Sequence, residues 1–264
     1  GWPFDERRSM PSAGASQPDP FEADVSKSSP LLERAPRSPE PPQDRFLVPG
    51  RTCWRLARAD RFALIVDACA YFLALRDAMA RARHSILLIG WDFDTRIRLD
   101  PNDGGGEWPN RLGDFVDALV EQRPDLQVRV LKWDLGVVQS LGRGGMPMFL
   151  LNWMTHRRVH LRLDGVHPFG ASHHQKIAII DDAMAFCGGI DITAGRWDTR
   201  EHRDVDPRRD SPWGFAQEPW HDATTAVDGD AARALGELAR DRWAHATGER
   251  LPAAPGGHDP WPDD

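Results

Sequence analysis

The chain has 264 residues, of which 41% are hydrophobic and 28% charged, and its formal net charge is −7. This composition predicts a soluble globular protein with a sizeable core, in one large domain or two small ones. The net charge provides no overall basic field for a nucleic-acid backbone or an anionic membrane, which argues against a nuclease unless a local basic cleft exists. No apolar run approaches the roughly 20 residues of a membrane span, and no signal peptide opens the sequence.

Two terminal segments have the composition of tails or linkers. Residues 1–45 contain nine of the 22 prolines, with Ser, Glu and Asp and no hydrophobic periodicity, and we expect a disordered tail there. Residues 251–264 are again rich in proline and predict a linker-like C-terminal tail. The folded domain is therefore expected between them, over residues 46–250.

Between these segments, apolar runs and 3.6-residue periodicities alternate along the chain. We expect strands near 46–58, 85–93, 95–99, 126–133, 159–163, 177–180, 183–186 and 220–227, and helices near 61–83, 111–122, 137–156 and 231–246. Strands alternating with helices predict an α/β layered domain. Residues 195–219 lack periodicity, and a loop of this length is often functional.

The three cysteines, Cys53, Cys69 and Cys187, form neither a paired framework nor a CxxC motif. Cys69 falls in a helical pattern and Cys187 in a strand, which favours thiols of the core. A reducing compartment is therefore expected.

The pattern that points to chemistry is His174-x-Lys176, at the start of the apolar run 177–180. Strand side chains repeat every second residue, so both should project from one face. An imidazole beside a fixed ammonium suits attack on a phosphate ester or proton transfer to it. Gly188 and Gly189 would let backbone N–H groups approach an anion. Lysine occurs only at positions 27, 132 and 176 in this arginine-rich chain. The choice of lysine at position 176 therefore suggests that the site requires a compact ammonium.

His174-x-Lys176, four residues, Asp181, six residues and Gly188-Gly189 together resemble the signature of the phospholipase D superfamily. The longer strings resemble its phosphatidyl-hydrolysing branch: His173-His174-Gln175-Lys176, Gly188-Gly189-Ile190-Asp191, Gly195-Arg196-Trp197-Asp198-Thr199 and Pro219-Trp220-His221-Asp222. The resemblance covers roughly residues 46–248. It implies an α/β fold with a mixed β-sheet flanked by helices on both faces, one half of the usual two-lobed enzyme.

The resemblance also implies roles for the motif residues. His174 would be the nucleophile, forming a phosphohistidine, or the general acid, and Lys176 would hold phosphate oxygens. Asp222 would orient His174, although a solvated aspartate at a strand end is the alternative. Asp181 belongs to the catalytic motif, but its position at a turn and on the opposite strand face indicates a structural partner.

The expected substrate-binding residues are Gly188, Gly189 and Asp191. The resemblance implies no cofactor and no catalytic metal, and the spacing of the other histidines does not match the usual ligand patterns.

The sequence contains a single His-x-Lys motif where phospholipase D enzymes generally carry two. The chain therefore supplies half a site, completed either by a second copy or by a missing C-terminal half. The first residue being Gly rather than Met, the phospholipase-like motif and the linker-like C-terminus favour an N-terminal half.

The leading hypothesis is a phosphodiesterase that acts on glycerophospholipids, by hydrolysis or transfer to an alcohol, in the cytoplasm and peripherally at a membrane. A homodimeric phosphodiesterase or nuclease with one motif per chain is the enzyme alternative, with nucleic acid not favoured as a partner. A non-catalytic lipid- or protein-interaction module of the same fold is the third.

Overall fold

The computed structural model describes residues 46–102, 106–133, 157–168, 171–212 and 214–262. The described residues from Leu47 onward belong to one compact unit. None of the helices described in it is long and apolar enough to cross a bilayer.

The described residues form one mixed sheet of seven strands in the order β1-β7-β6-β5-β2-β3-β4. The strands are β1 (Phe62–Val66), β2 (Ser85–Gly90), β3 (Gln127–Trp133), β4 (Val159–Asp164), β5 (Ile177–Ile180), β6 (Met184–Gly188) and β7 (Ala223–Asp228). β2, β3 and β4 run parallel, whereas β5 pairs antiparallel with β2 and begins an antiparallel series through β6 and β7 to β1. The candidate motif therefore precedes a strand in the centre of the sheet.

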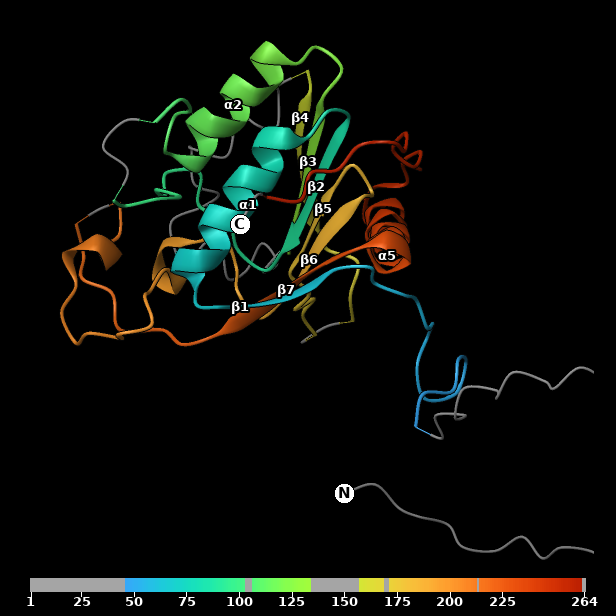
Figure 1. The fold of residues 1–264 in the computed structure, drawn as a ribbon, viewed down its shortest axis with the longest axis horizontal. Helices are drawn as coiled ribbons and strands as arrows, with labels where there is room; N and C mark the ends of the chain where they lie inside the picture. Colours follow the sequence, from blue (N-terminus) through green and yellow to red (C-terminus); the bar gives the residue numbers. More distant parts are fainter. Residues whose placement is uncertain (1–45, 103–105, 134–156, 169–170, 213, 263–264) are drawn as a thin grey trace, which may run out of the picture. The chain divides into compact units, whose positions relative to one another are not determined.

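Helices cover both faces of the sheet, as the sequence predicted (Figure 1). Helices α1 (Ala68–Arg81) and α2 (Leu112–Gln122) lie on one side and α5 (Gly229–Thr247) on the other. Strand alternation in β5 divides its side chains between two cores: Ala178 and Ile180 join the first, and Ile177 and Ile179 pack in the second, which contains Trp243 of α5. The mixed sheet with helices on both faces is thus confirmed.

Three predicted elements differ from the structure. The helix expected over 61–83 is divided into β1 and α1, because Asp67 between them has a φ of 67° that no helix can continue through. The strands expected near 46–58 and 95–99 are reduced to isolated bridges, Pro49 with Cys53 and Arg98 with Arg111. The helix expected over 137–156 lies outside the described residues.

The C-terminal segment predicted as a linker packs along the unit in its described part, residues 251–262. The backbone N–H of Ala254 donates to Asp182 at 2.8 Å, and the Arg61 guanidinium lies 4.6 Å from the centroid of the Trp261 ring. The three cysteines are free thiols, and burial raises the pKa of Cys69 and of Cys187, which keeps both thiols protonated.

Strands β6 and β7 approach each other closely at Gly188, which pairs with Thr224. A Cβ atom at position 188 would lie 2.4 Å from the Thr224 Cα, so any larger residue must push β7 away. This close approach brings the start of β7 to the end of β6, where the motif glycines lie.

We predict that Gly188→Ala lowers the free energy of unfolding by about 1–3 kcal/mol, the usual cost of overpacking. Gly256→Ala is the matched control because nothing lies within 4 Å of its new Cβ, and it should change stability by less than about 0.5 kcal/mol. Urea denaturation of both variants measures the difference. Equal stabilities would show that β7 yields to the added methyl group without cost.

Candidate active site

Lys176 is a buried lysine held by two neighbours immediately before β5. Lys176 is 7% exposed, and its Nζ forms an ion pair with Oδ2 of Asp191 at 3.1 Å. The same Nζ donates to the backbone carbonyl of His174 at 3.3 Å. A lysine ammonium has three donors, so these two contacts leave one N–H for a further acceptor.

Asp191 fixes Lys176 to the neighbouring strand. Its Oδ1 accepts the backbone N–H groups of Trp91 (2.8 Å) and Asp92 (3.2 Å), which directly follow β2. The residue is 2% exposed. Both oxygens thus contact protein groups and position Lys176, and the expected substrate-binding role of Asp191 stays a prediction.

His174 presents an exposed ring beside this buried pair. The ring meets the edge of Trp91 at 5.2 Å between centroids and an interplanar angle of 62°. Within the described residues, no side chain forms a hydrogen bond to the His174 ring. The site therefore combines the exposed His174 imidazole, whose ring has no hydrogen bond from a described side chain, with a neighbouring ammonium that is held in place.

Gly189 makes room for Asp222 at the start of β7. A Cβ atom at position 189 would lie 2.2 Å from Oδ1 of Asp222. That oxygen accepts the backbone N–H of Ala223 at 2.7 Å, and the indole Nε1 of Trp220 lies 3.5 Å from Oδ2. The described residues show no hydrogen bond between Asp222 and His174, so the orienting role of Asp222 stays a prediction.

The glycine pair serves packing in this structure. The N–H of Gly188 donates to the carbonyl of Lys176 at 3.3 Å, and that of Gly189 donates to the carbonyl of Ala223 at 3.0 Å. Both donors are thus used by neighbouring backbone segments, and the expected contact of these N–H groups with an anion stays a prediction. Glycine is required here because β7 and the Asp222 carboxylate come too close for a side chain.

Asp181 lies at the other end of β5 from Lys176 and does not join the site. It is 2% exposed, and its carboxylate accepts the backbone N–H groups of Arg83, His84 and Ser85 at 2.7–2.9 Å. Its φ of 52° places it in the turn before β6. Although Asp181 belongs to the catalytic motif, its oxygens are occupied in joining this turn to the start of β2.

Sequence reasoning missed the buried pair of Asp198 and Arg209, which holds the segment just before β7. Asp198 is fully buried, and its Oδ1 pairs with Nη1 of buried Arg209 at 2.9 Å. Its Oδ2 accepts from the backbone N–H of Trp220 at 2.9 Å and from Nδ1 of His202 at 3.0 Å. The only sequence signal was the position of Asp198 in the string 195–199.

Comparisons with known proteins agree with this motif. The family described as "Phospholipase D" matches residues 155–254. Phospholipase D B of Dictyostelium discoideum is 29% identical over 214 residues, covering 69% of this chain and 17% of that protein, and phospholipase D2 of Bos taurus is 27% identical over 167 residues, covering 60% and 17%. The chain therefore spans about a sixth of the length of these relatives.

Among solved structures, NucT from Helicobacter pylori aligns with a TM-score of 0.45 at 13% identity, covering 70% of this chain and 96% of that one. Nuc from Salmonella typhimurium, a phospholipase D family member, aligns with a TM-score of 0.41 at 16% identity, covering 72% and 100%. The matching family and the relatives, together with the motif immediately before β5, place the chain in the phospholipase D superfamily.

We predict that Asp191→Asn destabilises the protein by about 3 kcal/mol, because it leaves the buried Lys176 ammonium without its counter-charge. Asp92→Asn is the matched control: Asp92 pairs with Lys132 at 2.8 Å, but its side chain is 51% exposed. An exposed pair of this kind contributes less than about 1 kcal/mol. Denaturant unfolding measures both, and equal losses would contradict the special role of the buried pair.

We also predict a pH-dependent loss for Asp198→Asn. Burial alone would raise the pKa of Asp198, but hydrogen bonds from His202, from the N–H groups of Trp220 and Thr199, and from Arg209 outweigh it and lower the pKa. A carboxylate with a lowered pKa stabilises the fold above its unfolded pKa, and this contribution is lost as the pH falls through the folded pKa. The variant should therefore lose about 3 kcal/mol near neutral pH.

The difference in unfolding free energy between wild type and Asp198→Asn should narrow once the pH falls below about 4. Asp230→Asn, which breaks an exposed pair with Arg233, should cost less than about 1 kcal/mol at any pH. Urea unfolding from pH 7 to pH 3 makes the measurement. A difference that stays constant across this range would show that the Asp198 charge does not stabilise the fold.

Proposed function

We propose that this chain supplies one half of the active site of a phospholipase D-like phosphodiesterase that acts on glycerophospholipids. The carrying observation is the exposed His174 imidazole beside the buried Lys176 ammonium fixed by Asp191. The relatives named phospholipase D support the lipid substrate, and the three free cysteines support a reducing compartment. We place the activity in the cytoplasm, peripherally at a membrane surface.

The proposed chemistry proceeds in two displacements at phosphorus. A nitrogen of the His174 ring attacks phosphorus, and the bond from phosphorus to the head-group oxygen breaks as that oxygen takes a proton from a second histidine. Water then attacks the phosphohistidine, gives a proton back to the second histidine and releases phosphatidic acid and free His174. An alcohol in place of water would give transfer instead of hydrolysis.

Lys176 would stabilise the charge that develops on the phosphate oxygens. Two of its three donors already face His174 and Asp191, so the third is available for one oxygen. Because the ammonium is fixed before substrate arrives, little reorganisation is needed at the moment of reaction. The carboxylate of Asp191 holds the ammonium in place and does not itself act as a nucleophile toward phosphorus.

The second histidine must come from another segment, because the sequence has a single His-x-Lys motif. A C-terminal half of a longer enzyme is the preferred source. The single motif also favours a second candidate, a homodimeric phosphodiesterase in which each copy supplies one histidine to a shared site.

We predict a stoichiometric burst when this chain meets bis(p-nitrophenyl) phosphate, because p-nitrophenolate leaves without needing the second histidine as an acid. About one p-nitrophenolate per chain should be released, followed by slow turnover, and mass spectrometry after an alkaline denaturing quench, which preserves the N–P bond, should find the adduct on His174. His174→Asn should abolish the burst.

His173→Asn is the matched control and should keep the burst, since the adjacent imidazole instead contacts the carbonyl of Val166. Release that persists in His174→Asn, or no burst from the unaltered chain, would contradict the nucleophile assignment.

Choline release from phosphatidylcholine vesicles then tests the substrate: His174-dependent release by the chain alone indicates that two copies complete a site. Cleavage of single-stranded DNA without choline release would favour the homodimeric nuclease.

A further inference from the structure

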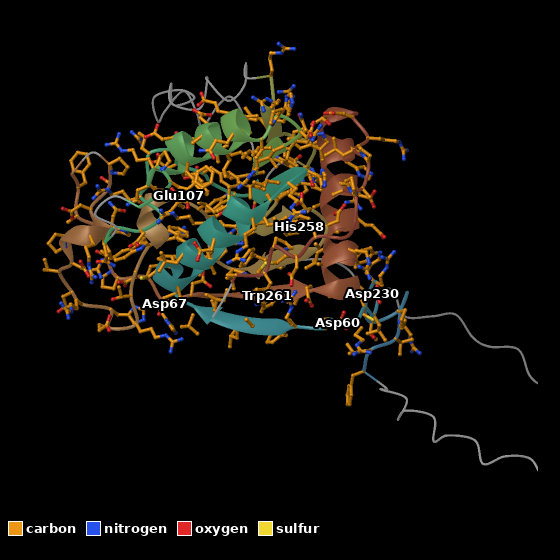
Figure 2. The ribbon with its side chains drawn as sticks, turned by 45° about the horizontal axis from the view of Figure 1, so that its top comes forward. Asp60, Asp67, Glu107, Asp230, His258 and Trp261 are labelled. Carbon is orange, nitrogen blue, oxygen red and sulfur yellow. The ribbon has the colours of Figure 1, made fainter. Side chains whose placement is uncertain are left out.

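A group of three potential metal ligands, which the sequence does not reveal, adjoins the backbone of Asp222. One ligand atom from each of Asp67, His202 and His221 lies within 4.8 Å of the other two. Asp67 precedes α1, His202 lies in the loop before β7, and His221 lies just before β7 itself. Figure 2 shows Asp67 at the junction of β1 and α1, and its backbone N–H donates to the carbonyl of Asp222 at 2.8 Å.

The Asp67 carboxylate is buried with one oxygen unsatisfied. The residue is 1% exposed, and Oδ2 forms no hydrogen bond. The nearest partner atom is Nε2 of His202, at 3.4 Å. A buried carboxylate oxygen without a hydrogen bond is costly, which calls for a further group at this position.

His202 is oriented as a metal-binding histidine usually is. Its Nδ1 lies 3.0 Å from Oδ2 of buried Asp198, which leaves Nε2 directed toward Asp67. Metal-ligating histidines almost always donate their other ring N–H to such a carboxylate. The Arg209 guanidinium in turn fixes Asp198 at 2.9 Å, so the second layer of the site is rigid.

His221 closes the group from the surface side. Its Nδ1 lies 2.8 Å from Oδ1 of Asp67, and its side chain is 68% exposed. The His202 and His221 rings meet edge to face with centroids 4.8 Å apart. Ligands at about 2.0–2.2 Å from a tetrahedral zinc ion lie roughly 3.4 Å from one another, so small side-chain rotations would complete the geometry.

The backbone holds two of these residues in strained conformations. Asp67 has φ = 67° and His202 has φ = 43°, two of only four non-glycine residues with positive φ in the described part of the chain. Such conformations cost about 1–3 kcal/mol each and gather at functional sites. Here the strain directs both side chains to one point.

We infer that Asp67, His202 and His221 form a binding site for a zinc-class divalent cation, with the remaining coordination open to solvent. Two imidazoles and one carboxylate suit zinc or a similar transition metal, whereas magnesium prefers oxygen ligands. The cation would join the β1–α1 junction to the entry of β7 and thereby fix the backbone of Asp222. This site is additional to the phosphodiesterase half-site.

The test is calorimetric titration of the whole chain, stripped with EDTA and dialysed, with Zn²⁺ and in parallel with Mg²⁺. We expect one Zn²⁺ per chain, a higher melting temperature with zinc, and no Mg²⁺ binding. Asp67→Asn and His202→Asn should weaken zinc binding by more than the roughly 10- to 100-fold that loss of an outer partner costs. Asparagine is chosen because it has the shape of aspartate at position 67 and tolerates the positive φ of position 202.

His245→Asn is the matched control, since this exposed histidine on α5 contacts the carbonyl of Asp241 away from the cluster. It should bind zinc as the unaltered chain does. Melting in EDTA verifies that each variant folds, and exposed His221→Asn serves as the ligand variant if a buried one does not. No zinc binding, or binding undiminished in the ligand variants that fold, would overturn the inference and leave the cluster as a metal-free hydrogen-bonded tie.

Discussion

The ion pair between Lys176 and Asp191 joins the approach to β5, the segment after β6 and the end of β2. Removing two charges from water is costly. Their mutual attraction compensates for this cost only if the other donors and acceptors of the two groups also form hydrogen bonds. Here the carbonyl of His174 takes one lysine proton, while the N–H groups of Trp91 and Asp92 occupy the other oxygen of the carboxylate. The geometry of the half-site follows from this constraint, because the partners of Lys176 also fix the backbone of His174.

Buried carboxylates play the same part elsewhere in the described unit. Asp67, Asp181 and Asp198 are almost inaccessible, and each accepts at least one backbone N–H from a distant segment. Each therefore acts as a tie between strands or loops rather than as a surface charge.

The sequence predicts what is local and misses what is assembled over distance. The run 177–180, the motif beside it and the mixed sheet could all be predicted because strand periodicity and motif spacing are properties of short segments. The boundary at Asp67 could not, since an apolar pattern at 62, 65 and 66 fits a helix as well as an edge strand. The cluster of Asp67, His202 and His221 could not be predicted from the spacing of these residues, because only the pairing of β1 with β7 brings the three together. Motif spacing singled out the glycine pair, but the packing reason for glycine there, the closeness of β7, depends on a strand more than 30 residues later.

The pairing of β1 with β7 has a consequence for how the protein is made. Arg61 and Asp228, at one end of this pair, are separated by 167 positions. Contacts of such high sequence separation form late, because the entropy of closing the intervening chain must be overcome first. During synthesis β1 must wait, with its core-facing side chains Ala63 and Ile65 still exposed, until β7 has left the ribosome. The earliest described strand is then the last to enter the sheet.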